Sequence, residues 1–394
     1  MTNTSPVANF PADNVRAAHQ GHYTTQLICA RELMTLTGPW ERLYDCAIEA
    51  NPFYGPDYLK ALATSLMSGR KSDLDWRACV VWHHAGQQPA RMAAMLPLSP
   101  HRGLFSPLRA LRHPFIVGGA PLLDAADPAG AASALLDGLC EEYRRPILVF
   151  DDMRLDWPAA RALLQACETD SRSSLVFDVY HRPGVTSADS AAAMDRSVLK
   201  NLRRRSKRLS ETGEVSITAP SSPEDCARAL RDFLNLEERG WKGRKKTALA
   251  SRPETLAFAG LAFNCVNTRP GIRFEVLRCN DQTLAANVNL VARDHAAAVK
   301  SAYDENYNTY SPGLMLDASV ADTLRLERWT PLLDSVAMPG HALEKLWVSP
   351  IRVGSIAMAA DRRKNTRNFD ARVSIERLRR RGREFAKEIY NSVR

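Results

Sequence analysis

Three consecutive segments between Gly271 and Tyr303 read as β-strands. The first alternates apolar and polar residues as a half-buried strand does, the second alternates less cleanly but is rich in Ala, Val and Leu, and the third follows directly. Turn-forming residues connect the segments. The segments run from Ile272 to Arg278, from Thr283 to Ala292 and from Ala296 to Tyr303. The pattern predicts a meander of three antiparallel strands.

A helix and a further strand are expected after the meander. Ser311 is a favoured N-cap residue, and Pro312 fits the first helical position, where its missing N–H costs nothing. Apolar residues recur at helical spacing from Leu314 to Leu326, and Leu332 to Val336 reads as a strand. A free helix start carries roughly half a positive charge, so Ser311-Pro312-Gly313 is either a phosphate site or an ordinary helix start. The order of the elements favours an acyl-transfer site.

The first half of the chain repeats this scheme more faintly. Strand-like and helical segments alternate over Arg77 to His84, Arg91 to Leu98, Ala129 to Tyr143, Pro146 to Phe150, Trp157 to Glu168 and Ser174 to Tyr180. Arg182 to Ala192 is rich in small and turn-forming residues. We therefore expect an N-terminal unit over residues 1–181, a linker over 182–192, a C-terminal unit over 193–360 and a basic helical tail over 361–394.

Length and composition agree with two globular cores. The chain has 394 residues, 45% of them hydrophobic and 25% charged. Its net charge is +9, but residues 361–394 alone carry twelve Lys/Arg and five Asp/Glu, so the excess belongs mainly to the tail. Apolar residues recur near helical spacing in that tail, at Ile375, Leu378, Phe385 and Ile389. Such a helix docks on its own domain, touches an anionic membrane surface or binds nucleic acid, and these interpretations stay open.

Metal binding, membrane spanning and secretion are not expected. The eight cysteines form no CxxC pair, and His83-His84 reads as a strand end. No apolar run approaches the ~20 residues that span a bilayer, and the first twenty residues lack the pattern of a secretory signal. We therefore expect a cytoplasmic protein without a metal cofactor.

Four phrases, in order, carry a resemblance to a known family. They are KNLRRRSKRLSETG from Lys200, LNLEERGWKGRKKTA from Leu234, KSAYDENYNTYSPGLML from Lys300 and DSVAMPGHALEKLW from Asp334. Over roughly Met194 to Trp347 the chain resembles the GNAT acetyltransferases related to the cellulose biosynthesis protein CelD. Lys246 departs from the glycine expected in the pattern GWKGRxGTA, which puts the conformation of that loop in question.

The resemblance implies an α/β (α+β) fold with two tandem GNAT-like units, each a mixed, largely antiparallel sheet flanked by helices. The related FemABX-type transferases carry two such folds side by side. Trp40 with Asn51-Pro52-Phe53 resembles the phrase that introduces the first unit in that family. The second unit is expected to be the catalytic one.

The resemblance also implies the donor, acetyl-CoA or another acyl-CoA. Main-chain groups near Ala302 and Tyr303 would hold the acyl carbonyl and the pantetheine. The expected phosphate contacts are Ser311, Pro312, Gly313 and Leu314, together with Arg203 from the basic run Lys200 to Arg208. An amine then attacks the thioester directly, without a covalent enzyme intermediate, so that a base and an acid suffice.

Several polar residues are candidates for the acid, the base and the acceptor contacts. Glu237 and Glu238 are candidate bases, and one of the two should point inward; Asp304 is a further candidate. Tyr303 and Tyr307 are candidate acids for the leaving thiolate. The candidate acceptor contacts are Arg239, Trp241, Lys242 and Lys300. Each of these residues also has an ordinary structural explanation.

Three functions remain open at this point. The first is CoA-dependent acylation of an amine on a small molecule or saccharide precursor. The second is a FemABX-like transfer from aminoacyl-tRNA, which would use the basic runs. The third is a non-catalytic module in envelope polysaccharide assembly. The acceptor, the acyl chain length and the oligomeric state do not follow from the sequence.

Overall fold

A computed structural model describes residues 22–67, 76–101, 106–143, 146–189, 195–266, 268–362 and 366–392. The strands are β1 (His22–Cys29), β2 (Arg77–His84), β3 (Arg91–Leu98), β4 (Leu108–Arg109), β5 (Leu122–Leu123), β6 (Ile147–Arg154), β7 (Ser174–Thr186), β8 (Val215–Thr218), β9 (Gly271–Cys279), β10 (Gln282–Val291), β11 (Ala296–Tyr303), β12 (Leu332–Asp334) and β13 (Ser349–Ala359). The α-helices are α1 (Ala30–Thr35), α2 (Thr37–Cys46), α3 (Pro56–Leu66), α4 (Pro128–Glu142), α5 (Pro158–Thr169), α6 (Arg196–Ser210), α7 (Pro223–Arg239), α8 (Trp241–Arg244), α9 (Pro253–Ala262), α10 (Pro312–Glu327) and α11 (Thr366–Ser392). Short 3-10 helices include η4 (Glu305–Tyr310).

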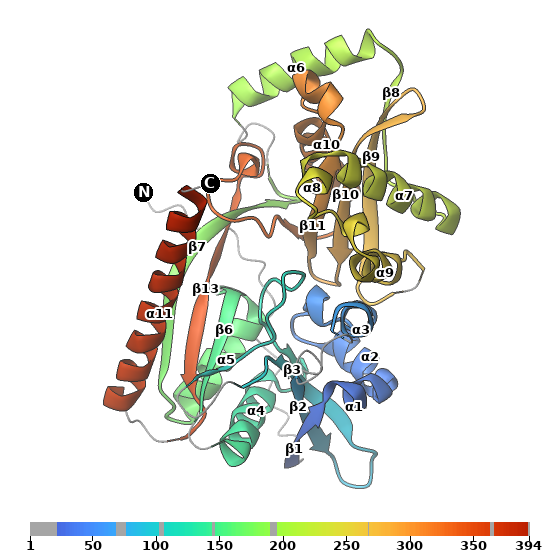
Figure 1. The fold of residues 1–394 in the computed structure, drawn as a ribbon. Coiled ribbons are helices and arrows are strands. Elements are labelled where there is room, and N and C mark those ends of the chain that lie inside the picture. Colours follow the sequence, from blue (N-terminus) through green and yellow to red (C-terminus); the bar gives the residue numbers. More distant parts are fainter. Residues whose placement is uncertain are drawn as a thin grey trace.

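The strands form two sheets that helices cover. A four-stranded sheet has the order β1-β2-β3-β5, and a nine-stranded sheet has the order β4-β6-β13-β7-β12-β11-β10-β9-β8. Most neighbouring strands are antiparallel; the β4–β6 and β11–β12 pairs are parallel. In Figure 1 the N-terminal half lies below and the C-terminal half above, with the long strands β7 and β13 reaching from one to the other. The fold class of mixed, largely antiparallel sheets with flanking helices is as expected.

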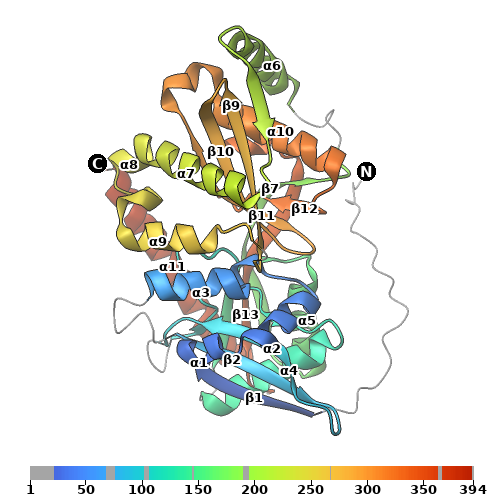
Figure 2. The same cartoon turned by 90° about the vertical axis from the view of Figure 1, so that its right-hand side faces the viewer.

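The C-terminal half sandwiches its sheet between helices. Alternate residues of β10 face opposite sides: Val288 joins the core beneath α7, which also contains Phe233, whereas Asn287 bonds to Asp317 of α10. Helix α7 therefore covers one face of the meander and α10 the other (Figures 1 and 2). The predicted meander is present, and β11 has the predicted bounds.

Strand β13 is the main element that the sequence pattern did not predict. It lies between β6 and β7 and pairs antiparallel with both. β7 itself continues to Thr186, so it occupies the first part of the expected linker, whose last residues, 190–192, lie outside the described residues. A strand from the end of the expected C-terminal unit thus completes the sheet of the N-terminal half. The residue boundaries of the two units remain a prediction.

The two halves meet through a packed and hydrogen-bonded junction. The Tyr58 ring of α3 meets the Phe258 ring of α9 edge-on, with 5.5 Å between centroids, and Figure 2 shows these helices side by side. The turn between β10 and β11 reaches back to the N-terminal half, where Arg293 donates to the carbonyls of Asp45 and Ala47 at 2.8 and 2.5 Å. The position of β11 relative to the N-terminal half is therefore fixed by direct contacts.

Helix α11 of the basic tail packs along the sheet of the N-terminal half (Figure 1). Phe369, Val373 and Glu376 are buried, but Ile375 and Leu378 are 49% and 67% exposed. The apolar stripe noted in the sequence therefore does not form the docking face. Its continuation, Phe385 and Ile389, lies outside the residues whose side chains are described.

Candidate functional site

One edge of β11 is open over most of its length. The parallel strand β12 pairs with β11 only at Ala296 and Ala297, and no other described strand lies on that side. On the other side, β10 pairs with β11 along its whole length except at Val299, an extra residue that forms a bulge. A bulge of this kind bends and twists a strand. Strand β11 therefore diverges from β12 near the bulge.

The strand register shows which main-chain groups face the open edge. The N–H of Asp304 donates to the carbonyl of Leu284 directly opposite, at 2.8 Å. Because bonded and non-bonded pairs alternate in an antiparallel ladder, Ala302 also bonds to β10, whereas Ser301 and Tyr303 face the open edge. In agreement with this, the Ser301 carbonyl accepts a hydrogen bond from Lys242 Nζ at 2.9 Å. Of the two expected main-chain contacts, the register places Tyr303 at the open edge and assigns Ala302 to β10.

Helix α10 begins just beyond this edge, at the residues expected from the sequence. Ser311 is the N-cap residue in a left-handed conformation, with φ 56°, and its side chain does not cap the helix. Pro312 follows at the first helical position and has no N–H. The first turn therefore leaves the N–H groups of Gly313 and Leu314 without an acceptor inside the helix. A Cβ at Gly313 would lie 3.4 Å from the ring of Tyr303, so this ring packs beside the helix start.

A cation reaches the start of α10 from the basic helix α6. Arg205 donates to the hydroxyl of Ser311, and Arg208 lies over the ring of Tyr310, 5.9 Å from its centroid. Arg203, the expected phosphate contact, is exposed. Residues two apart on a helix do not share a face, so Arg203 and Arg205 point in different directions. The structure therefore brings Arg205, not Arg203, to the helix start.

The start of helix α4, in the N-terminal half, differs from that of α10 because it carries its own negative group. Helix α4 also begins with a proline, but its N-cap is Asp127, whose carboxylate accepts from the Gly130 N–H at 2.9 Å. The same carboxylate accepts from the Tyr23 hydroxyl at 2.8 Å. A negative group thus already occupies the position that an anion would take. Of the two helix starts, only that of α10 is open to a phosphate.

Glu237 is the inward-pointing member of the predicted glutamate pair. Glu237 is 2% exposed, and its carboxylate accepts hydrogen bonds from Lys242 Nζ at 2.9 Å and from the Leu249 N–H at 2.7 Å. Lys300 Nζ of β11 lies 3.9 Å away. Burial lowers the pKa of Lys300, as does the charge of Lys242, whereas Glu237 raises it. The structure thus gathers Glu237, Lys242 and Lys300 beside the open edge.

The remaining candidates on this segment are at the surface. Glu238 and Arg239 are exposed, and Trp241 is 44% exposed with Lys245 Nζ 5.4 Å from its ring centroid. Lys246 has φ 55°, the left-handed conformation that the expected glycine adopts readily. The loop is therefore formed despite the substitution, at a cost of about 1 kcal/mol.

The polar segment after β11 is held by its own hydrogen bonds. Asp304 accepts from the Asn306 N–H at 2.9 Å and from Gln282 Nε2 at 3.1 Å. Tyr307 donates its hydroxyl to Gln282 Oε1 at 3.1 Å. Glu305, which the sequence interpretation missed, accepts from the Trp241 N–H at 2.6 Å and so ties η4 to α8. Asp304 and Tyr307 are therefore hydrogen-bonded within this segment. Of the candidate bases Glu237, Glu238 and Asp304, only Glu237 is buried.

Two acidic residues are enclosed between the sheet and α10. Burial raises the pKa of Glu275 to about 7, although Arg273 opposes the shift. Burial likewise raises the pKa of Asp317 to about 6, and the hydrogen bond from Asn287 only partly offsets it. These groups lie under the helix whose start is the candidate phosphate site. They couple the stability of that helix to pH.

A cavity of about 340 Å³ lies in the N-terminal half. Most of the residues from 110 to 119 line it, together with Asp151 and Asp152. Phe115 is adjacent in sequence to two of the lining residues, and its ring lies 5.6 Å from that of His113. Lys300 Nζ of β11 lies 4.9 Å from the Phe115 ring centroid, so β11 approaches the segment that lines the cavity.

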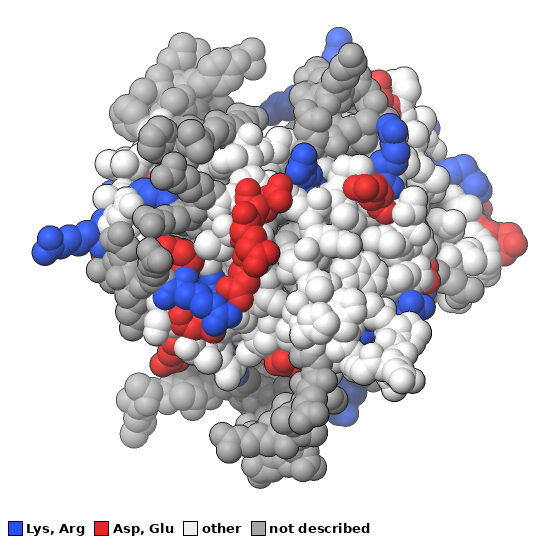
Figure 3. All heavy atoms as spheres, turned by 90° about the horizontal axis from the view of Figure 1, so that it is seen from below, with Lys and Arg blue, Asp and Glu red and all other residues white. Residues whose placement is uncertain are grey.

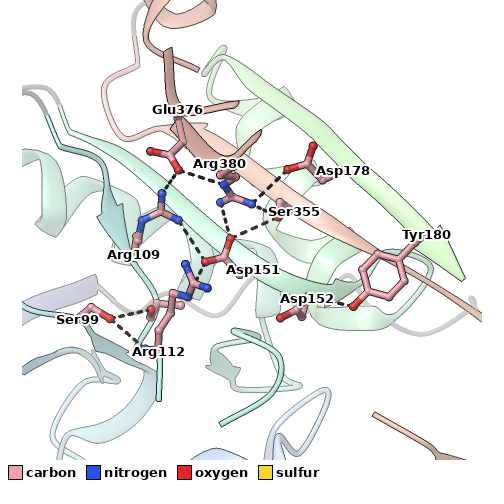
Figure 4. A network of polar contacts seen from close by, with 11 residues as sticks. Ser99, Arg109, Arg112, Asp151, Asp152, Asp178, Tyr180, Ser355, Glu376 and Arg380 are labelled. Atoms are coloured by element: carbon pink, nitrogen blue, oxygen red, sulfur yellow. Dashed lines mark hydrogen bonds and ion pairs between the residues drawn. The ribbon is translucent and has the colours of Figure 1, made fainter. Parts of the chain in front are cut away.

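The two aspartates at this cavity differ in their partners (Figure 4). Asp151 accepts from Arg109 at 3.2 Å and from Arg380 of α11 at 2.5 Å, and Arg112 lies 3.4 Å away. Asp152 has φ 53° in a bulge of β6 and accepts from the hydroxyl of Tyr180 at 3.0 Å. Strained conformations of this kind cluster at functional sites. Asp152 is the less compensated carboxylate in the cavity wall.

Two searches of the described residues have negative results. They contain no group of three or more His, Cys, Asp or Glu side chains arranged to hold a metal ion. Among the helices that the structure describes, none combines the length and the apolar character needed to cross a membrane.

Comparison with known proteins identifies the class of the C-terminal half. Residues 196–329 match the model of the acetyltransferase (GNAT) domain. This range includes the open edge of β11, the start of α10 and the Glu237 group. The chain therefore carries a GNAT acetyltransferase domain and is an acyltransferase, as expected from the sequence.

Solved structures are similar in fold over most of the chain. FemX has a TM-score of 0.50 at 8% identity, covering 85% of this chain and 96% of FemX. A conserved protein of unknown function from Bacteroides thetaiotaomicron has a TM-score of 0.48 at 12% identity, covering 83% and 96% of the two chains. A tandem GNAT protein from the clavulanic acid biosynthesis pathway has a TM-score of 0.40 at 11% identity, covering 86% and 99%. At these identities, the likeness to FemX speaks for the fold alone. A search of curated proteins gave no significant match.

Proposed function

We propose that the protein is a CoA-dependent N-acyltransferase whose C-terminal unit binds acyl-CoA. The observation that carries this proposal is the start of α10, where two N–H groups and Arg205 surround an uncapped helix end beside the open edge of β11. The contrast with α4, whose start is filled by Asp127, supports the choice of unit. The resemblance to CelD-related acetyltransferases leads to the same proposal.

The residues present fit an acyl-CoA. Gly313, Leu314 and Arg205 would bind phosphate oxygens, and the outward main-chain groups of Ser301 and Tyr303 would pair with the amides of the pantetheine arm. The thioester supplies an acyl group that an amine can attack without a covalent enzyme intermediate. Donors fixed at the strand edge would stabilise the negative charge that develops on the acyl oxygen.

Glu237 would accept the proton of the attacking amine. In the absence of substrate its charge is balanced by Lys242, whose amino group bridges Glu237 and the Ser301 carbonyl. An incoming ammonium group makes the same two contacts, so it would take the place of Lys242 Nζ. Lys242 and Lys300 would then flank the base, with Trp241 at the rim of the site. Tyr303, whose ring lies against Gly313, would be the acid for the leaving thiolate.

The cavity beside Phe115 would receive the remainder of the acceptor. Asp152 offers a carboxylate with one hydroxyl partner, and Arg112 and His113 offer donors. This lining suits a polar acceptor that carries amino and hydroxyl or acidic groups, such as an amino acid or amino sugar. The proposal includes a role in polysaccharide biosynthesis and a cytoplasmic location. Transfer from aminoacyl-tRNA is the alternative donor chemistry.

Calorimetric titration with acetyl-CoA tests the proposal directly. Wild-type protein should bind acetyl-CoA, and the Arg205→Gln variant should bind it about tenfold more weakly because one charge-assisted contact is lost. The Arg203→Gln variant is the matched control on the same helix and should bind like wild type. No binding of acetyl-CoA or a longer acyl-CoA by the wild-type protein would refute the proposal.

A further inference from the structure

Helix α6 presents a row of positive charge to solvent. Arg196, Lys200, Arg203 and Lys207 are spaced four, three and four residues apart, so they lie on one face of the helix. All four are exposed, as are the neighbouring Arg204 and Arg208. The row extends over twelve residues, from Arg196 to Lys207, or about 16 Å.

This row has no acidic partners in the part of the chain that the structure describes. The helix itself contains no acidic residue, and none of the six exposed cations forms an ion pair with a described side chain. Cations elsewhere are commonly paired, as Arg362 is with Asp137 and Asp170. On the face seen in Figure 3, basic side chains near the centre likewise lie against acidic ones. Like charges at helical spacing destabilise a helix, so the row is a cost to folding that an external partner would offset.

The opposite face of the same helix forms part of the donor site. Leu202 and Leu209 are buried in the domain, and Arg205 contacts Ser311. The basic row therefore faces away from the phosphate position and lies beyond it. A group attached to the outer side of the bound phosphate would meet the row, whereas the phosphate itself would meet Arg205.

The helix start is also sized for a single phosphate. Pro312 has no N–H, and the N–H of Met315 bonds to the Ser311 carbonyl at 3.0 Å. Only Gly313 and Leu314 then offer main-chain N–H groups in the first turn. One phosphate on a pantetheine arm would use these donors fully.

On the basis of the proposed function, we infer that the same donor site accepts, besides acyl-CoA, an acidic carrier protein that bears the acyl group on a phosphopantetheine arm. The arm lies along β11, its phosphate binds at Gly313 and Leu314, and an acidic helix of the carrier docks on the row of α6. Acetyl-CoA shares the arm and the phosphate, so it binds the same site without using the row. Charge complementarity between the two proteins supplies orientation and speeds association.

A binding experiment with two charge-reversal variants tests this inference. One variant reverses the row, with Lys200→Glu, Arg203→Glu and Lys207→Glu together. The matched control reverses three exposed cations of the N-terminal half, with Arg31→Glu, Arg42→Glu and Arg161→Glu. Each full-length protein is titrated with a bacterial acyl carrier protein loaded with an acetyl group, with acetyl-CoA and with total tRNA. Circular dichroism checks folding, and the Gln versions of the row variant replace the Glu versions if folding is lost.

The row variant should bind the loaded carrier at least about tenfold more weakly than wild type, with acetyl-CoA binding changed less than about twofold. The control variant should bind both ligands like wild type. The inference is overturned if wild type binds acetyl-CoA but not the loaded carrier, or if the row variant binds the carrier normally. Loss of tRNA binding in the row variant, without carrier binding by wild type, would assign the row to nucleic acid. Failure of wild type with both acetyl-CoA and the carrier would instead refute the proposed function.

Discussion

Replacing Ser311 with aspartate should convert the open helix start of α10 into the closed form seen at α4. Aspartate tolerates the left-handed conformation that Ser311 adopts. The new carboxylate would cap the helix and pair with Arg205, which now contacts the Ser311 hydroxyl. A negative charge at a helix start stabilises it by about 0.3–1 kcal/mol, so the variant should unfold at a slightly higher temperature than wild type.

The same substitution should weaken acetyl-CoA binding. Two unit charges 4 Å apart near a protein surface repel by about 4 kcal/mol, and screening by salt at a partly exposed site leaves about 2 kcal/mol. Affinity should therefore fall about thirtyfold, and more at low salt. Calorimetry at two salt concentrations measures the change, and Ser311→Asn is the uncharged control. The reasoning is refuted if the aspartate variant binds acetyl-CoA as tightly as wild type, or if the asparagine variant loses as much affinity.

Three further substitutions test the base, the buried acid and the tail. Glu237→Gln should lower kcat about 10²-fold or more if Glu237 is the base; a change in KM alone would show that it only holds Lys242. Burial raises the pKa of Asp317 to about 6. Between about pH 4 and pH 6 the folded protein therefore keeps the Asp317 proton that the unfolded chain has lost. The stability of the wild-type protein should fall as the pH rises through this range. Asp317→Asn should remove the part of this fall that Asp317 causes and leave the part due to Glu275, whose pKa burial raises to about 7. The variant should be more stable than wild type at pH 8 by about 2 kcal/mol in urea unfolding; equal stability at pH 8 would contradict the assigned cause. Arg380→Ala should lower the free energy of unfolding by about 2 kcal/mol, because Asp151 and Glu376 each lose a partner. Arg381→Ala, at an exposed neighbouring residue, should change it little. Equal losses in the two variants would show that the network does not hold α11 in place.

Local patterns in the sequence predicted the elements whose contacts are local. The three strands of the meander follow one another directly, and the turn residues before Ala296 were sufficient to place β11 at its actual bounds. Strand β13 was not predicted because its partners β6 and β7 lie far back along the chain. Its residues form an almost continuous buried run that alone does not reveal a position between two earlier strands.

In the candidate site, too, the features that depend on local sequence were predictable and those that depend on tertiary contacts were not. Ser311 and Pro312 were found because helix starts have local preferences. The sequence left open which of Glu237 and Glu238 points inward. Glu237 stands four residues after Phe233 and shares its helix face, and the structure buries that face. The choice of Arg205 over Arg203 depends on which face of α6 packs on the domain, and that is set by tertiary contacts of Leu202 and Leu209.

The two halves have complementary properties that make the donor and acceptor sites parts of one structure. The C-terminal half has an open helix start and an open strand edge, while the N-terminal half has its helix start closed by Asp127 and instead contains the cavity beside Asp152. The sheet around that cavity is completed by β13, which follows the GNAT domain in the chain, and is braced by Arg380 of α11. Residues C-terminal to the donor site therefore support the strand that contributes Asp151 and Asp152 to the proposed acceptor site. Because Lys300 of β11 also lies over the ring of Phe115, next to the cavity lining, a shift of either half changes the distance between acyl donor and amine acceptor. The junction between the halves is thus part of the proposed catalytic geometry as well as of the fold.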